Sequence, residues 1–257
     1  MKTPLRIAHL TDIHIGPGDA PISRIAVRHN FRRVLATLAA LPPDLLVISG
    51  DLAAHAGELD AYQWIAAQLQ DLNWPYVVMM GNHDRLATLR QAFPLNATEI
   101  REERYYFRRD LQGHRLLFLD SGPYQVNPAQ LDWLHAECAS YPDEILLFIH
   151  HPPLPCGCTF MDSRHGLQNS AEVWQILLSL PNIRHIFCGH YHTERTLVRD
   201  GKVLYLTPST MMQIDTHSPG FAIEHLQPGW RIIEWDGTTL CSHVHYLPSA
   251  ETQTHPA

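Results

Sequence analysis

Metal-binding side chains follow five short apolar runs of this sequence, each at the point where the run ends. In the stretch 79–84, two methionines lead into Gly81 and then into Asn82, His83 and Asp84. The other four runs end in Asp12 with His14, Asp51, His150 with His151, and His190 with His192. Buried imidazoles and carboxylates without a partner are costly, so core packing alone does not explain five such endings. A bound cation would supply the missing partner.

The spacing inside these endings indicates ligands that act together. In an extended segment, residues i and i+2 point the same way, so Asp12 and His14 can address one ion. The same argument joins His190 and His192. Glycines stand beside three of the endings and would let the backbone turn tightly there: Gly50, Gly81 and Gly189.

The donor set is mixed and contains no thiolate. It comprises two Asp, one Asn and four His: Asp12, His14, Asp51, Asn82, one of His150 and His151, His190 and His192. Such oxygen and nitrogen donors suit Mn²⁺, Fe or Zn²⁺ better than Ca²⁺. Seven ligands are too many for one ion. Two ions that share a carboxylate, roughly 3.5–4 Å apart, are therefore expected.

An alternation of strands and helices must position these residues. Seven short apolar runs predict buried strands at 5–10, 44–50, 76–81, 115–120, 144–150, 185–190 and 202–207. Helical periodicity predicts helices at 27–41, 58–72, 127–139 and 169–181, and residues 220–247 predict further strands joined by turns. This order predicts an α/β protein with one domain over 1–247 and a polar tail over 248–257. In open α/β sheets, ligands bind beyond the carboxyl ends of strands, where these loops would converge.

Composition excludes several classes of protein. The 257 residues carry a formal charge of −7 without a basic run, which argues against a partner that is a nucleic acid polymer. No run approaches the ~18 apolar residues of a membrane span, and we expect no secretory signal. Five cysteines, an odd number, fit a reducing cytoplasm, and the Cys156–Cys158 pair is interpreted as two loop thiols. Among the eighteen histidines, five show no partner pattern: His29, His55, His135, His217 and His255.

In this order, the motifs D-x-H, G-D, G-N-H-D, H-H-P-P and G-H-x-H resemble those of the calcineurin-like metallophosphoesterases. The resemblance spans about residues 7–209. The H-H-P-P variant and the ending of the chain are similar to bacterial class III cyclic nucleotide phosphodiesterases of the 3′,5′-cyclic-AMP type. The resemblance implies a four-layer α/β/β/α sandwich of two mixed sheets flanked by helices, the metallo-dependent phosphatase fold.

The resemblance also implies a role for each residue. Asp12, His14 and His192 would hold one ion, and Asn82, His150 and His190 the other. Asp51 would bridge the two, and His151 would lie behind the ligands or pack. His83 would donate a proton or stabilise charge, Asp84 would hold the His83 ring, and Asn82 would assist. Substrate would contact His14, Asn82, His83 and His192. The two ions would be Fe or Mn, with Zn or Co as alternatives.

The expected reaction is hydrolysis of 3′,5′-cyclic AMP to 5′-AMP by attack of a metal-bound hydroxide. Alternatives are other phosphodiesters, such as glycerophosphodiesters or 2′,3′-cyclic nucleotides, and a non-catalytic interaction scaffold. The complete ligand set argues against the scaffold. In the loop 155–166, four residues are candidates for substrate specificity: Cys158, Phe160, Asp162 and His165. The partner is expected to be a small molecule, with a homodimer as a weaker expectation.

Overall fold

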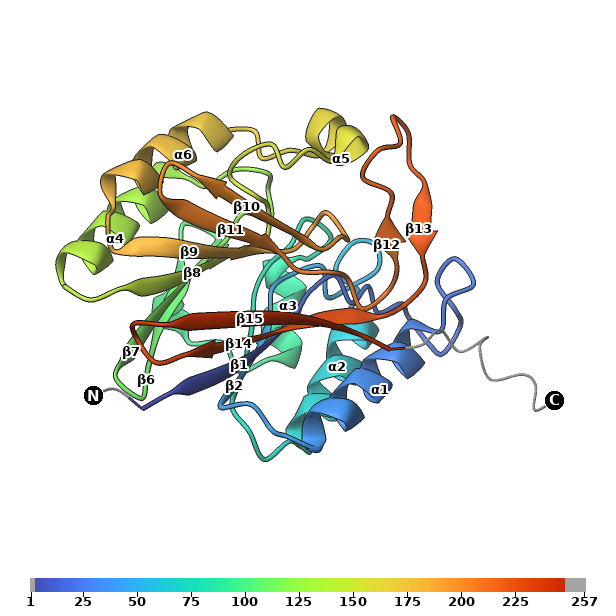
Figure 1. Ribbon diagram of the computed structural model, residues 1–257. Coiled ribbons are helices and arrows are strands. Elements are labelled where there is room, and N and C mark those ends of the chain that lie inside the picture. Colours follow the sequence, from blue (N-terminus) through green and yellow to red (C-terminus); the bar gives the residue numbers. More distant parts are fainter. Residues whose placement is uncertain (1–2, 248–257) are drawn as a thin grey trace.

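Two sheets form the centre of the structure, a computed structural model that describes residues 3–247 (Figure 1). One sheet has five strands in the order β15-β14-β1-β2-β3. Strands β1, β2 and β3 are parallel, and β14 and β15 extend the sheet antiparallel beside β1. The bounds are β1 Leu5–Leu10, β2 Leu45–Ile48, β3 Tyr76–Val78, β14 Gly229–Trp235 and β15 Leu240–Tyr246.

The second sheet has six strands in the order β10-β11-β9-β8-β7-β6. Its four inner strands are parallel, whereas β10 and β6 are antiparallel at the two edges. The bounds are β6 Phe107–Leu111, β7 His114–Leu119, β8 Ile145–Ile149, β9 Ile183–Cys188, β10 Arg195–Arg199 and β11 Lys202–Leu206. Both sheets are therefore mixed, as expected.

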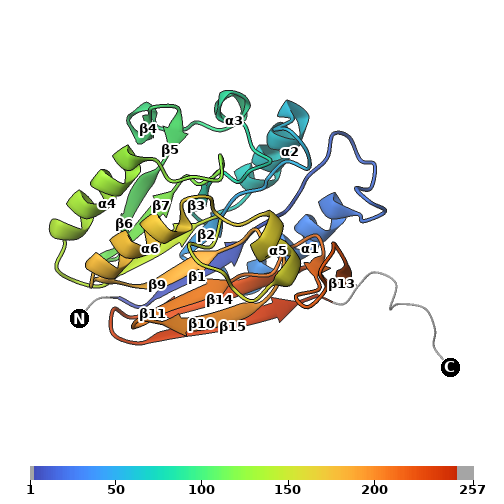
Figure 2. The same cartoon turned by 90° about the horizontal axis from the view of Figure 1, so that it is seen from above.

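Helices cover the outer face of each sheet, which gives the predicted four layers (Figure 2). Helices α1 and α2 pack on the five-stranded sheet, with α3 beside α2, and helices α4 and α6 pack on the six-stranded sheet. Their bounds are α1 Val27–Ala39, α2 Leu59–Gln70, α3 Leu86–Ala92, α4 Pro128–Ala139 and α6 Ser170–Ser179. The short helix α5, Thr159–Arg164, lies away from these layers.

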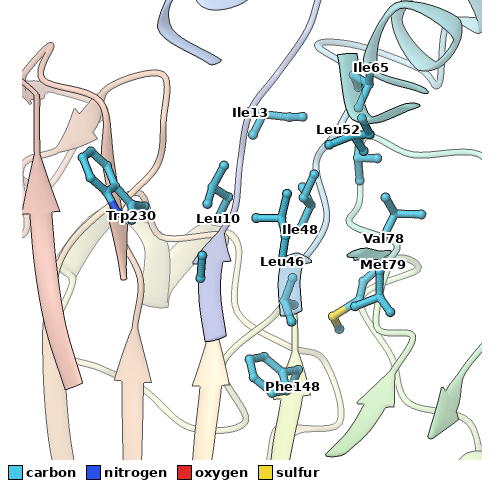
Figure 3. Packing of buried hydrophobic residues seen from close by; sticks show 14 of the residues in the cluster. Leu10, Ile13, Leu46, Ile48, Leu52, Ile65, Val78, Met79, Phe148 and Trp230 are labelled. Carbon is cyan, nitrogen blue, oxygen red and sulfur yellow. The ribbon is translucent and has the colours of Figure 1, made fainter. Parts of the chain in front are cut away.

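Successive side chains of the six-stranded sheet belong alternately to two separate hydrophobic clusters. In β7, Leu116 and Phe118 belong to the cluster between the sheets, whereas Leu117 and Leu119 belong to the cluster under α4 and α6. This is the period of two expected for a strand that is buried on both faces. Figure 3 shows Phe148 of β8 in the same inter-sheet cluster as residues of β2. The two sheets thus form a firmly packed base for the loops at their carboxyl ends.

The predicted elements are confirmed, with shifted ends and several omissions. The strands predicted at 44–50 and 76–81 end at Ile48 and Val78, because the chain turns into loops before the glycines. Elements that the sequence analysis missed are α3, α5, β6, β10, β12, the 3₁₀ helix Ala97–Glu99, and the hairpin of β4 and β5. In that hairpin, β4 Ile100–Arg101 pairs with β5 Arg104–Tyr105. Strand β12, Gln213–Ile214, pairs with β13, Ile223–His225, which lies in the predicted strand region 220–247. The predicted tail, 248–257, lies outside the described residues.

Candidate metal centre

Loops that leave five parallel strands of the two sheets meet at one rim. They follow β1, β2 and β3 of one sheet and β8 and β9 of the other. We call the seven predicted ligands that they carry the rim cluster: Asp12, His14, Asp51, Asn82, His150, His190 and His192. All except Asn82 are buried, and Asn82 is half-buried.

Distances within the rim cluster are short enough for shared metal ligation. The ligand atoms of Asp12, His14 and His192 lie within 4.8 Å of one another. Asp51 takes part in two such groups, one with His14 and one with His150. Its Oδ2 lies 3.8 Å from His14 Nε2 and 3.5 Å from His150 Nε2. Asp51 therefore stands between the two sides of the cluster.

Five of the seven backbones are left-handed, which corrects the spacing argument. The φ angles are +52° at Asp12, +44° at His14, +49° at Asp51, +68° at His190 and +46° at His192. These residues are not extended, so the two-residue period of a strand is the wrong reason for their convergence. The left-handed region costs about 1 kcal/mol or more for a side chain other than glycine, and such strain gathers at functional sites.

Two glycines make the close packing under the cluster possible. Gly50 has a φ of +106°, which favours glycine. At Gly189, a Cβ atom would collide with the hydroxyl oxygen of Thr11. Both positions therefore need glycine, one for its backbone conformation and the other for lack of space.

Backbone carbonyls fix the tautomers of three histidines in the cluster. Nδ1 of His150 donates to the Ser49 carbonyl at 2.8 Å, and Nε2 of His190 donates to the His165 carbonyl at 2.8 Å. Nδ1 of His192 lies 3.2 Å from the Met212 carbonyl. A carbonyl can only accept, so the proton sits on that nitrogen and the other nitrogen keeps its lone pair for the cluster. Metal-ligating histidines are oriented in this way.

Two features of the rim cluster are compatible with a bound cation: buried oxygen atoms without hydrogen-bond partners, and carboxylates that attract positive charge. Asp12 Oδ1 and Asn82 Oδ1 are buried without a hydrogen-bond partner among residues 3–247. Burial lowers the pKa of His14 to about 4 and that of His190 to about 3. Burial also opposes protonation of His150, but the Asp51 and Asp12 carboxylates raise its pKa to about 9. The two carboxylates thus attract positive charge, which a bound cation would provide.

The two histidines of the H-H-P-P motif differ in their surroundings. Nε2 of His150 faces the carboxylates of Asp51 and Asp12, at 3.5 and 3.9 Å. The ring of His151 lies against that of His190, with centroids 4.1 Å apart, and its Nδ1 is 2.9 Å from Ser121 Oγ. Like its neighbours, His151 is buried, and its ligand atoms lie within 4.8 Å of those of His150 and His190. His150 occupies the position expected of a ligand between the carboxylates.

The predicted contact between Asp84 and the His83 ring is wrong. Asp84 accepts hydrogen bonds from the backbone N–H groups of Leu52, Ala53 and Gly81 and from Tyr62 Oη. The His83 ring instead donates from Nδ1 to the Ala54 carbonyl at 2.8 Å. The carboxylate is occupied by these donors, so it acts on His83 through the two loops that it fixes, the one that carries Ala54 and the one that carries His83 itself.

A pocket of about 360 Å³ opens beside the rim cluster. His83 lines it, with its Nε2 4.0 Å from Asp51 Oδ2. Of the four predicted specificity residues, Phe160 and His165 line the pocket. Asp162 instead accepts hydrogen bonds from the backbone N–H groups of Cys156 and Cys158 at the start of α5, and Cys158 is buried. These two residues therefore shape the loop rather than the pocket.

Several residues of the pocket were missed by the sequence analysis, which had set His55 aside. They are His55, Tyr124, Met211, Met212, Ile214 and Phe221. The sequence could have indicated several of them, because ligands bind in loops beyond the carboxyl ends of strands and these residues lie in such loops. Tyr124 follows β7, His55 follows β2, and the two methionines follow β11.

The fold and the rim cluster together define a class of protein: an α/β/β/α sandwich whose His and Asp clusters are compatible with a dinuclear metal site. The sequence profile of the calcineurin-like phosphoesterases matches residues 5–194, which is most of the chain. The chain belongs to the calcineurin-like phosphoesterase family. The family resemblance inferred from the motifs is confirmed.

Curated relatives align with nearly the whole chain. A Fibrobacter succinogenes protein named probable cyclic nucleotide phosphodiesterase is 41% identical over 245 residues, covering 95% of this chain and 95% of its own. The 3′,5′-cyclic adenosine monophosphate phosphodiesterase CpdA of Escherichia coli K12 is 32% identical over 272 residues, covering 98% of this chain and 92% of its own.

Solved structures support the fold. A dimetal phosphatase from Danio rerio superposes with a TM-score of 0.63 at 15% identity, over 93% of this chain and 98% of that chain. Purple acid phosphatase PPD1 from yellow lupin has a TM-score of 0.70 at 13% identity, over 96% of this chain and 52% of that chain. Within residues 3–247, no helix combines the length and the hydropathy needed to cross a bilayer.

Proposed function

We propose that this protein is a dinuclear-metal phosphodiesterase that hydrolyses 3′,5′-cyclic AMP to 5′-AMP. The observation that carries the proposal is the set of backbone-fixed imidazoles that meet two carboxylates beside a pocket of about 360 Å³. The names of the relatives point to the same reaction, since one is a probable cyclic nucleotide phosphodiesterase and another a 3′,5′-cyclic-AMP phosphodiesterase.

The rim cluster would hold the two ions in two sets of ligands. Asp12, His14 and His192 would bind one ion; Asn82, His150 and His190 would bind the other, and Asp51 would bridge them. Fe and Mn suit this mixture of carboxylate, amide and imidazole donors, as do Zn and Co. When bound, two such ions offset charge on phosphoryl oxygens and lower the pKa of a nearby water to near neutrality.

His83 is proposed to serve the leaving group. Its Nδ1–H is committed to the Ala54 carbonyl, so Nε2 is the atom that faces the pocket. A ring protonated on both nitrogens would donate from Nε2 to the departing ribose 3′ oxygen. His83, Asn82, His14 and His192 all line the pocket, where they would contact the phosphate. Asp84 is proposed as a positioning residue for the loop that orients His83.

The dimensions of the pocket favour a small substrate over a polymer. A volume of about 360 Å³ lies within the range of roughly 300–1,000 Å³ that is typical for small ligands. The chain is acidic, with a charge of −7, which disfavours a nucleic acid backbone. Glycerophosphodiesters and 2′,3′-cyclic nucleotides are the competing substrates. Every ligand position of the rim cluster carries a residue that can bind metal, and His83 is present beside them. Both features argue against a non-catalytic scaffold.

The proposal is tested by turnover of cyclic AMP. The full chain, reconstituted with Mn²⁺, is assayed with 3′,5′-cyclic AMP, 2′,3′-cyclic AMP, glycerophosphocholine and an activated aryl phosphodiester. We expect 3′,5′-cyclic AMP to give the highest kcat/KM among the natural esters and to yield 5′-AMP. Turnover of the activated ester alone would contradict the assigned substrate. Failure with every ester would contradict the enzyme assignment itself.

A further inference from the structure

Two aromatic side chains line the pocket that opens beside the rim cluster. Phe160 lies on α5, and Phe221 lies on the loop between β12 and β13. Both line the pocket, and their ring centroids are 6.1 Å apart at an interplanar angle of 66°. We propose that these two phenylalanines hold the base of the cyclic nucleotide and thereby give the enzyme its preference for nucleotides. The inference rests on the function proposed above.

A series of ring contacts connects the cluster to this aromatic pair. The His190 ring contacts the His165 ring at 6.4 Å, and the His165 ring contacts the Phe160 ring at 5.1 Å. Phe221 follows as the next ring. A ligand with its phosphate at the rim cluster would therefore place its sugar near His165 and its base at the phenylalanines.

The geometry of the pair suits a flat group. Aromatic rings prefer offset stacking or edge-to-face contact. Because the two rings are inclined by 66°, a base stacked on one would present its edge to the other. The wall beside them is apolar and includes Met161, Met212 and Ile214. A glycerol or choline group would leave both rings without a stacking partner.

The exposure of Phe221 also indicates a binding role. Its side chain is 55% exposed, although phenylalanine is a residue type that is usually buried. Its loop is held in place by two backbone hydrogen bonds. Asp215 N–H donates to the Ala222 carbonyl at 2.9 Å, and Thr159 N–H of α5 donates to the Thr216 carbonyl at 2.9 Å. The ring is thus presented at the pocket by a fixed loop next to the helix that carries Phe160.

The test compares two substrates that share the reacting phosphate ring and differ in the base. The substrates are 3′,5′-cyclic AMP and ribose 3′,5′-cyclic phosphate without a base, assayed with the Mn²⁺-loaded full chain. The variants are Phe160→Ala, Phe221→Ala and Phe221→Leu. Ile223→Ala is the matched control, because Ile223 is a nearby exposed apolar side chain, 44% exposed, outside the lining of the pocket.

We expect each alanine variant to raise KM for cyclic AMP about 10-fold, the usual scale for loss of one base–aromatic stack. The kcat for cyclic AMP and the kcat/KM for the abasic ester should change less than about 2-fold. Phe221→Leu removes the ring but keeps apolar bulk. Because the proposed contact is ring stacking, its KM for cyclic AMP should resemble that of Phe221→Ala. Ile223→Ala should match the wild type.

Two outcomes would overturn the inference while leaving the proposed function intact. One is an unchanged KM for cyclic AMP in both alanine variants. The other is an equal loss on both substrates, which would mean general disruption of the site. A wild-type protein that hydrolyses neither cyclic ester would overturn the proposed function and this inference with it.

Discussion

At the scale of single residues, the metal centre depends on where each lone pair points. The carbonyls of Ser49, His165 and Met212 decide this for three histidines. No pattern in the sequence specifies those carbonyl contacts, although the residues of the rim cluster were predicted from the strand endings. The chemistry of each side chain was therefore readable, and its orientation was not.

His83→Ala should reduce turnover without loss of metal. The ring lies at the pocket and its Nε2 is 4.0 Å from Asp51 Oδ2, yet it is not one of the proposed ligands. Removal of one general acid typically lowers kcat by about 10²-fold or more. The measurements are kcat for cyclic AMP and metal content by elemental analysis. Unchanged turnover would remove His83 from the mechanism.

Asp51→Ala should lower metal content, because Asp51 stands between His14 and His150. We expect fewer than two ions per chain after dialysis against buffer that contains Mn²⁺, and a matching loss of activity. Asp60→Ala serves as a control, since Asp60 is an exposed aspartate away from the cluster that accepts hydrogen bonds from Gly18 and Arg28. Two ions retained in Asp51→Ala would contradict the bridging role.

The neighbouring histidines His150 and His151 should respond differently to alanine. His150 faces the two carboxylates, whereas His151 packs against His190 and Tyr124. His150→Ala should lose at least one ion. His151→Ala should keep both ions and lose part of its thermal stability, because the substitution leaves a cavity in a buried site. Metal content measured side by side decides the assignment, and the reverse result would exchange the roles.

At the scale of elements, the loops that follow the strands position the residues of the rim cluster. Asp84 shows how one side chain holds two such loops together. Its carboxylate ties the loop after β3 to the loop after β2 through the backbone N–H groups of Leu52 and Ala53, and also accepts from Gly81 in its own loop. The strands and helices were largely predictable, because apolar runs and helical periodicity depend on local sequence. The left-handed backbones, the β12–β13 hairpin and the true partner of Asp84 depend on contacts between distant segments, which local patterns do not contain.

Asp84→Asn should destabilise the protein and slow the reaction together. One carboxylate oxygen becomes an amide NH₂ group that faces backbone donors, so at least one buried charged hydrogen bond is lost. The expected decrease in the free energy of unfolding is about 2 kcal/mol. Turnover should also fall, because the same loop carries the Ala54 carbonyl that holds His83. Urea denaturation and kcat are measured beside Asp60→Asn, which should change the free energy by less than about 0.5 kcal/mol. An Asp84→Asn variant that matches this control in both measurements would contradict the positioning role.

At the scale of the whole molecule, the two sheets meet across a buried histidine. His9 of β1 contacts the Phe148 and Phe187 rings of the other sheet and lies within hydrogen-bond distance of Ser49 and Thr207. Burial, aided by the nearby positive Arg231, lowers the pKa of His9 to about 3. The interface between the sheets thus contains a group that must stay uncharged while the protein is folded.

This arrangement predicts an acid-sensitive fold. The pKa of His9 rises to about 6.5 on unfolding, so below that pH the unfolded chain binds a proton that the folded chain does not. Stability is therefore lost as pH falls, by about 2 kcal/mol between pH 6.5 and pH 5. His9→Gln removes the group that takes up this proton. The difference in pH dependence between wild type and variant therefore reports on His9 and not on the other titrating groups. Urea denaturation at pH 7.5, 6.5 and 5.0 should show a shallower pH dependence for the variant. Parallel curves would contradict the assignment.

The hydrogen bonds from the histidines to main-chain carbonyls have a consequence for how the protein obtains its ions. They are made by the nitrogens that face away from the centre, so they do not depend on which ion binds, or when. These three rings are therefore held in orientation by the folded chain itself. The arrangement is in this sense preassembled: folding sets these three side chains, and binding of an ion need not turn them.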